Sequence, residues 1–307
     1  MLRYIVRRLL QSVFVILGVT FVAFGLMFLR GDPANLMLSE HATQQEIQEL
    51  RQRMGFDRPW PEQYARYVAK AVQGDFGTSL FHRTDAMRVV VERLPATLEL
   101  AIAALLLSVL VAVSLGTVAA VYRNSLWDRI SIVVAMVGQA VPNYFLGVLL
   151  ILFLGVRWNL LPISGRDSWQ HLVMPAITLA ALPLAQNTRM VRSSLLEVLG
   201  QDYIRTAHAK GLPHGFVIWR HGLRNALIPL ITLVGLQFGY LISGAIIVET
   251  IFAWPGVGRL ILQAVGVKDF PVIQAAVTIL ATIFVLLNLI VDIAYTYLDP
   301  RIRSSIS

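Results

Sequence analysis

The sequence contains six apolar stretches, each long enough to cross a lipid bilayer as a helix. A hydrocarbon core about 30 Å thick needs roughly 20 apolar residues in helical form. The stretches are residues 9–29, 96–121, 130–154, 172–190, 226–250 and 274–298. Only 14% of residues are charged, whereas soluble domains carry about a quarter. We therefore expect an all-α integral membrane protein with about six transmembrane helices.

The basic residues predict the orientation of these spans. Thirteen lysines and arginines fall at the two termini, in the loop 122–129 and in or beside the loop between the fourth and fifth spans. The two short loops on the other side hold four. Because cytoplasmic loops are rich in lysine and arginine, both termini are expected in the cytoplasm. The net charge of +8 is explained in this way without a nucleic-acid partner.

The first span resembles a signal peptide, because basic residues precede it. It is longer than a typical signal core, and no small-x-small cleavage site follows before Asp32. We expect residues 1–29 to form a short tail and a retained helix. Residues 30–95 would then form a periplasmic insertion, 96–298 the membrane core, and 299–307 a cytoplasmic tail.

The insertion is expected to be helical. Thr43 and Glu46 have the spacing of a capping box that opens a helix, and Gly55 is expected to end it near residue 54. Pro59 and Pro61 should delay the next helix, predicted over 63–72. Two readings stay open: a cap packed on the membrane domain, or a docking surface for an external partner.

The loop 193–224 between the fourth and fifth spans is too long for a simple connector. One helical face is formed by residues spaced three or four apart, namely Leu196, Leu199, Tyr203 and Ala207. Gly211, followed by Pro213, predicts the end of that helix and a tight turn.

A second short helix should follow the turn. Its apolar face is expected to carry Phe216, Trp219 and Leu223. A helix, a glycine turn and a helix favour a binding platform. The alternative is an amphipathic hairpin lying on the membrane surface.

Catalytic signatures are missing from the sequence. Each of the three lysines follows alanine or valine, so no Gly-Lys-Ser/Thr phosphate loop exists. There is no His-Glu-x-x-His or Gly-x-Ser-x-Gly motif and no cysteine, and the six histidines lack metal-ligand spacing. We expect no enzyme, no catalytic or metal-binding residue, and no cofactor on this chain.

Uncharged polar residues within the spans are the better candidates for a transport route. Polar groups at membrane depth face helix interfaces or water-filled paths. The candidates are Gln139, Asn143, Tyr144, Gln186, Asn187, Gln237, Tyr240 and Ser243. Hydrogen bonding between helices is an equally open explanation for any one of them.

Two motifs carry a family resemblance: DYIRTAHAKG at 202–211 and HGLRNALIP at 221–229. Together they resemble the cytoplasmic signature loop of permeases in binding-protein-dependent ABC importers, in the form of the dipeptide, oligopeptide and nickel branch. The general pattern of Glu-Ala-Ala, three residues and Gly, then Ile-x-Leu-Pro, is kept at Ala207, Gly211 and Leu223. Arg205, Thr206, His221 and Arg224 depart from it in the manner of that branch.

Shorter fragments extend the resemblance over nearly the whole chain. They are RGDP at 30–33, GFDRP at 55–59, GDFGTS at 74–79, LPAT at 94–97, FAWPGVGR at 252–259 and LDPR at 298–301. In its length and in these motifs, the sequence is most similar to glutathione-type and dipeptide-type first permeases.

The resemblance implies a type I importer permease fold in the bacterial inner membrane. It also implies a second homologous permease, a periplasmic substrate-binding protein, and two ATPase subunits that bind ATP and Mg. The residues it places at the ATPase contact are Arg205, Thr206, Ala207, Lys210, Gly211 and Leu223.

The competing hypothesis is an ion-coupled secondary transporter of small polar solutes. Such proteins are commonly built from inverted repeats with broken helices at matching positions. The sequence contains no convincing internal repeat, and the loop 193–224 would have no role in such a transporter.

Overall fold

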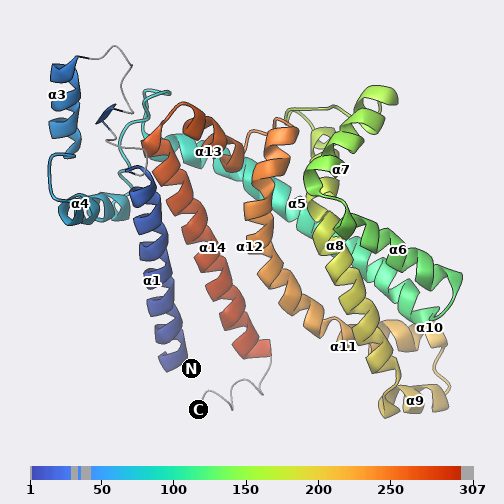
Figure 1. Ribbon diagram of the computed structural model, residues 1–307. Helices are drawn as coiled ribbons and strands as arrows, with labels where there is room; N and C mark the ends of the chain where they lie inside the picture. Colours follow the sequence, from blue (N-terminus) through green and yellow to red (C-terminus); the bar gives the residue numbers. More distant parts are fainter. Residues whose placement is uncertain (1, 29–33, 36–42, 299–307) are drawn as a thin grey trace. The chain divides into compact units, whose positions relative to one another are not determined.

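The computed structural model (Figure 1) describes residues 2–28, 34–35 and 43–298. In these ranges the regular structure is helical, apart from an isolated antiparallel bridge between Thr78 and Asp85. The predicted tail 299–307 and much of the stretch 30–42 lie outside the described residues. The chain divides into two compact units, Met1–Thr97 with Pro255–Ser307, and Leu98–Trp254.

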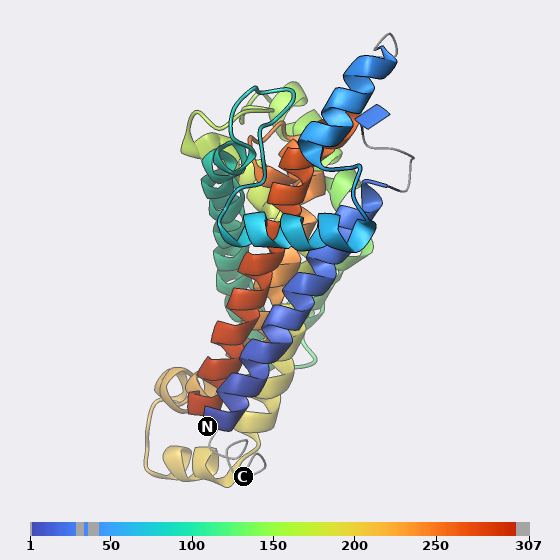
Figure 2. The ribbon, with the colours of Figure 1, turned by 90° about the vertical axis from the view of Figure 1, so that its left-hand side faces the viewer.

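The first unit is built on α1 (Leu2–Leu26) and α14 (Phe270–Leu298), which run side by side (Figures 1 and 2). The short helix α13 (Val257–Gly266) packs against α14. Apolar residues from the start of α5 (Ala86–Val121) join α13 and α14 in a buried cluster that includes Val90, Leu260 and Val272.

The insertion begins with the predicted capping box. In α3 (Gln44–Met54), the Glu46 backbone N–H donates to Thr43 Oγ1 at 3.3 Å, and the Thr43 N–H donates to Glu46 Oε2 at 2.8 Å. The bonds from Thr43 hold the pKa of the Glu46 carboxyl below its usual value. Gly55 ends the helix with φ +76°, as predicted.

The second insertion helix starts earlier than predicted. α4 spans Trp60–Val72, three residues ahead of the expected 63. Pro61 lies in its first turn, where a missing N–H removes no helical hydrogen bond. The prediction that the prolines delay the helix was therefore wrong.

Helix α4 lies across α1 (Figure 2) and is fastened to it by aromatic side chains. Phe24 stacks on Tyr67 with ring centroids 5.5 Å apart, and Tyr64 Oη donates to the Leu17 carbonyl at 2.8 Å. Tyr67 Oη lies 3.1 Å from Thr278 Oγ1 on α14. The insertion therefore caps the α1–α14 pair.

A buried carboxylate holds the loop between α4 and α5. Asp269 is only 1% exposed. It accepts hydrogen bonds from Ser79 Oγ at 2.5 Å, from the Phe81 N–H at 3.2 Å and from the Leu80 N–H at 3.3 Å. One side chain therefore satisfies three donors from a segment nearly 190 residues away in sequence.

We predict that Asp269→Ala destabilises this loop by about 2–3 kcal/mol, because buried donors are left without a charged acceptor. Asp269→Asn keeps one acceptor oxygen and should therefore destabilise the loop less than Asp269→Ala does. Thermal unfolding of the detergent-solubilised protein and protease cleavage between residues 73 and 85 measure the effect. An unchanged unfolding temperature in Asp269→Ala would contradict the assignment.

The second unit is arranged around α8 (Trp169–Leu199). The other long elements there are the C-terminal part of α5, α6 (Leu126–Ala140), α7 (Asn143–Leu150), the π-helix η1 (Ile151–Arg157) and α12 (Ile228–Ile251). Glycines let these helices approach closely. A Cβ on Gly138 would lie 2.6 Å from the Ala181 carbonyl oxygen, and one on Gly116 would lie 2.7 Å from Val191 Cβ.

Four helices in the described residues are long and apolar enough to cross a membrane: 6–25 of α1, α5, α12 and 270–291 of α14. A fifth span is formed if α6 is taken together with α7 and η1, a pair of helical segments bent by 106°. The remaining predicted span, 172–190, lies in α8, which is 31 residues long but less apolar than the others.

The third span was predicted as one continuous helix over 130–154, and this was wrong. Val141 is extended, with φ −91° and ψ 122°, and Pro142 starts α7 as its N-cap. A residue before proline avoids the helical conformation because the proline ring collides with it. The apolar stretch therefore breaks between Ala140 and Asn143.

Candidate functional site

The loop 193–224, called the platform below, lies at the end of α8 opposite Trp169 (Figure 1). Its elements are the last turns of α8, then α9 (Asp202–Ala209), α10 (His214–Phe216) and the π-helix η2 (Val217–Leu223), which leads into α11 (Arg224–Ala226). At 1.5 Å per residue, the platform begins about 36 Å along α8 from Trp169.

The first platform helix was predicted to be continuous from Leu196 to Ala207, and the structure corrects this. Leu196 and Leu199 belong to α8, and Gln201 is extended, with φ −77° and ψ 150°. Gly200 ends α8, consistent with the weak helix propensity of glycine. Helix α9 can therefore take a direction of its own.

Helix α9 is held by a small apolar core. Ile204 and Ala207 are buried against Val217 of η2, with Leu199 and Leu212 packed around them. A small side chain at 207 lets α9 lie close to η2. Helix α9 is therefore in direct apolar contact with η2 and with the end of α8.

Gly211 makes the turn between the two helices. Its φ is +78°, which only glycine adopts without strain, and a Cβ there would meet no atom within 4 Å. The Gly211 N–H donates to the His208 carbonyl at 2.9 Å. Backbone conformation, rather than space, requires this glycine.

The six predicted coupling residues divide into two groups. Ala207 and Leu223 are buried and hold the platform together. The exposed ones are Arg205, Thr206, Lys210 and Gly211. The Arg205 contact with Asp202, at 3.4 Å, joins two highly exposed side chains and contributes little stability. This face of α9 is polar, basic and available to a partner.

The second platform helix does not bury the face that was predicted. Phe216 and Trp219 are exposed, whereas Val217, Ile218 and Leu223 are buried. The reason is the π-helical geometry of η2, whose i→i+5 hydrogen bonds give more residues per turn than the expected period of 3.6. Only Leu223 was predicted correctly.

A partly buried ion pair joins α6 to α8 just before the platform: Asp128 is buried, whereas the Arg192 side chain is 26% exposed. Arg192 Nε and Nη2 donate to the two carboxylate oxygens of Asp128 at 2.8 and 2.9 Å. Asp128 also accepts from the Asn124 N–H at 2.9 Å, and its own N–H donates to Ser125 Oγ at 3.4 Å. Sequence reasoning missed this pair. Ser125, three residues before Asp128, is a helix-start signal that could have drawn attention to it.

We predict that Arg192→Met lowers stability by about 1–3 kcal/mol, because it leaves the buried Asp128 carboxylate without its charged partner. The double variant Asp128→Leu/Arg192→Met should recover most of this loss. Unfolding temperatures of the purified single and double variants measure it. If the double variant is as unstable as Arg192→Met, the loss of stability does not come from an unpaired Asp128 carboxylate.

Three of the predicted pathway residues form hydrogen bonds between helices. Gln237 Nε2 of α12 donates to Gln186 Oε1 of α8 at 3.0 Å. Asn187 Nδ2 of α8 donates to Ser108 Oγ of α5 at 3.5 Å. Asn187 is completely buried, and Gln237 is 5% exposed.

The other pathway candidates are at least partly accessible on this chain: Gln139, Asn143, Tyr144, Tyr240 and Ser243. Gln139 and Asn143 flank the break at Pro142, where the backbone leaves the helical path. Their place in a transport route stays a prediction.

Comparison with known families identifies the chain. Residues 112–304 match the model of the binding-protein-dependent transport system inner membrane component, and residues 1–101 match its N-terminal companion model. The chain belongs to this family. It is a multi-pass membrane permease of an ABC importer, and its role is transport rather than catalysis.

Similar proteins cover the full chain. The glutathione transport system permease protein GsiC of Escherichia coli (strain K12) is 42% identical over 304 residues, 99% of each chain. The same protein of Salmonella paratyphi A is 42% identical, and that of Shigella flexneri serotype 5b is 41% identical, each over 99% of both chains.

A solved structure shares the fold. The crystal structure of an amino acid ABC transporter with histidines matches with a TM-score of 0.52 and 17% identity, over 70% of this chain and 94% of the other. At this identity the likeness concerns the fold alone, and it supports the predicted type I permease architecture.

Proposed function

We propose that this permease, paired with a second homologous permease, forms the import route for glutathione or similarly small peptides in a bacterial inner membrane. A periplasmic binding protein delivers the substrate, and two separate ATPase subunits supply the energy. The proposed substrate class rests on the similarity to GsiC over the whole chain. The exposed face of α9 on its buried support carries the coupling role.

The proposed mechanism uses α9 as the contact with an ATPase subunit. Arg205, Thr206 and Lys210 present donors and positive charge to the partner. Closure of the ATPase pair displaces α9. The packing of Ile204 and Ala207 on Val217 then passes the displacement to η2 and α8. The polypeptide has no phosphate loop of its own, so the motor must be another chain.

The Asp128–Arg192 pair extends this path to a second span. It fixes the start of α6 to α8 next to the platform. A rotation of α8 would therefore move α6 and alter the broken span at Pro142, beside the candidates Gln139 and Asn143. In this proposal the termini and the platform are cytoplasmic, and the insertion faces the periplasm.

We predict that Gly211→Ala lowers ATPase stimulation by the substrate-loaded binding protein about tenfold, because a non-glycine residue at positive φ costs about 1–2 kcal/mol. The matched control is Gly215→Ala, where a Cβ also meets no atom within 4 Å but φ is not positive. Equal stimulation in both variants would remove the reason for assigning Gly211 to coupling.

A second variant tests the buried side of α9. Ala207→Glu places a charge in the Ile204–Val217 core and should uncouple hydrolysis from transport while the spans still insert. Membrane fractionation checks insertion, and ATP-driven uptake checks coupling. Normal uptake by Ala207→Glu would contradict the proposed lever.

Reconstitution separates the competing functions. The complete transporter in liposomes, with ATP on the platform side and the binding protein on the other, should accumulate labelled glutathione. Dipeptides and nickel chelates are compared in the same assay. ATP-driven uptake of other solutes but not of glutathione would contradict the proposed substrate. Ion-driven uptake by this chain alone would favour the secondary transporter.

A further inference from the structure

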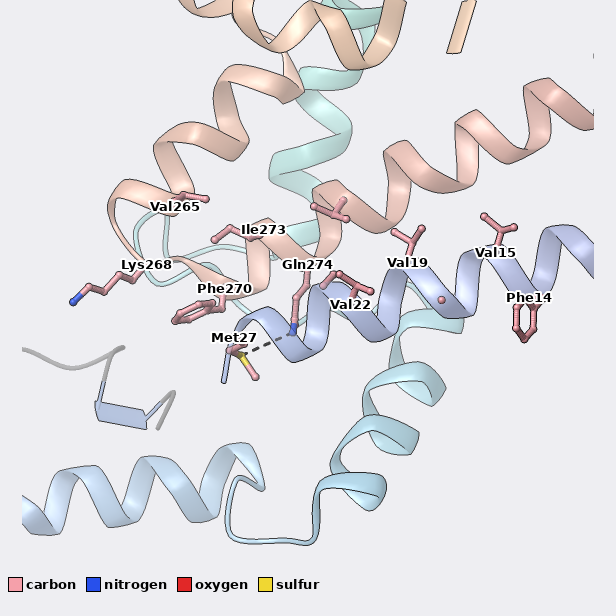
Figure 3. A pocket seen from close by; sticks show the side chains of 13 residues that line it. Phe14, Val15, Val19, Val22, Met27, Val265, Lys268, Phe270, Ile273 and Gln274 are labelled. Atoms are coloured by element: carbon pink, nitrogen blue, oxygen red, sulfur yellow. Dashed lines mark hydrogen bonds between the residues drawn. The ribbon is translucent and has the colours of Figure 1, made fainter. Parts of the chain in front are cut away.

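The first unit contains a groove of about 630 Å³ along α1 and α14 (Figure 3). Its lining is apolar except for Gln274 and Lys268. Gln274 is buried, and its Nε2 donates to Met27 Sδ at 3.9 Å. The interior therefore offers a ligand apolar surface rather than hydrogen-bonding groups.

The groove is about as long as one leaflet of a membrane. Its lining runs along α1 from Phe14 to Met27, the residue just after the helix, which is thirteen steps, or about 20 Å at 1.5 Å per residue. Half of a hydrocarbon core is about 15 Å. One wall is α1, and the other combines the first turns of α14 with Val265 of α13 and Lys268. Both α1 and α14 are long and apolar enough to span the membrane.

A glycine opens the groove at mid-length. Gly18 lines it, and a Cβ built there meets no atom within 4 Å. A glycine inside a helix costs about 1 kcal/mol relative to alanine, and among the described residues no close contact with another helix accounts for it. The neighbouring Phe14 ring is 78% exposed. The notch leaves room for a flexible chain beside it.

A cation lies at one end of the groove. Figure 3 shows Lys268 beside Phe270, with its Nζ directed away from the spans. The adjacent Asp269 does not neutralise it, because that carboxylate is turned toward Ser79 and the Phe81 N–H. Within the described residues Lys268 forms no ion pair.

We propose that the groove holds one acyl chain of an anionic phospholipid, with the lipid phosphate bound by Lys268. A length near one leaflet, an apolar lining and a single terminal cation match the chemistry of such a lipid. The alternative occupant, an apolar helix of the second permease, has no phosphate for Lys268 to bind.

The test titrates the purified, complete transporter with palmitoyl-oleoyl phosphatidylglycerol or with phosphatidylcholine of the same chains, and counts bound lipids by native mass spectrometry. Phosphatidylglycerol should bind about fivefold more tightly, the factor expected from one lysine near an anionic lipid. Lys268→Gln should abolish this preference. Its control, Lys70→Gln, removes an exposed lysine outside the groove.

A second pair of variants tests the cavity itself. Gly18→Leu fills the notch and should reduce binding of both lipids, whereas Val13→Leu, at an exposed position on α1 outside the lining, should not. Equal binding by Gly18→Leu and the unmodified protein would overturn the proposal, as would an undiminished preference in Lys268→Gln. A photoreactive group at Val22 should label lipid, and labelling of the second permease instead would also overturn it.

Discussion

Close backbone approach to α8 is the interaction on which the second unit depends. Helices in lipid gain little from burying apolar surface against one another, so they associate through tight packing and hydrogen bonds between helices. Because Gly138 has no side chain, the Ala181 backbone of α8 can pack directly against it, and Val191 packs in the same way against Gly116. Gln186 then bonds to α12 and Asn187 to α5. With α6 also fixed by the Asp128–Arg192 pair, α8 can transmit a displacement of the platform to several helices together.

The first unit uses different contacts. Its insertion is held by aromatic rings that pack α4 on α1, and by the buried Asp269 carboxylate that gathers the loop after α4. These contacts form a rigid cap at one end of the α1–α14 pair. The groove in the same unit is lined by side chains from α1 and from the segment 265–277, which meet only in the folded chain.

Local sequence signals predicted part of this architecture well. Thr43, Glu46 and Gly55 bound α3 as expected because capping is decided by a few neighbouring residues. The break at Pro142 was also local, but hydropathy concealed it, since a bent span is as apolar as a straight one. At Phe216 and Trp219 the expected period failed because η2 is a π-helix.

Other features could not be read from the sequence, because they join distant segments. Asp128 and Arg192 are 64 residues apart, and Ser125 marks the start of α6 without indicating which residue Asp128 pairs with. The coupling residues were selected by family resemblance. The structure adds that Ala207 and Leu223 support the platform from inside while Arg205 and Lys210 face outward. That division is consistent with the proposed lever, because one face of α9 is packed and the other is exposed.

The most direct test locates that free face in the assembled transporter. The chain has no cysteine, so a single cysteine replacing the exposed His208 on α9 can carry a short maleimide-linked photoreactive group. The account predicts cross-linking to an ATPase subunit and loss of ATP-driven uptake, with no such product from a cysteine replacing Thr43. The account would be contradicted by an intact, active transporter in which the group at position 208 reacts only with water or lipid and forms no cross-link to an ATPase subunit.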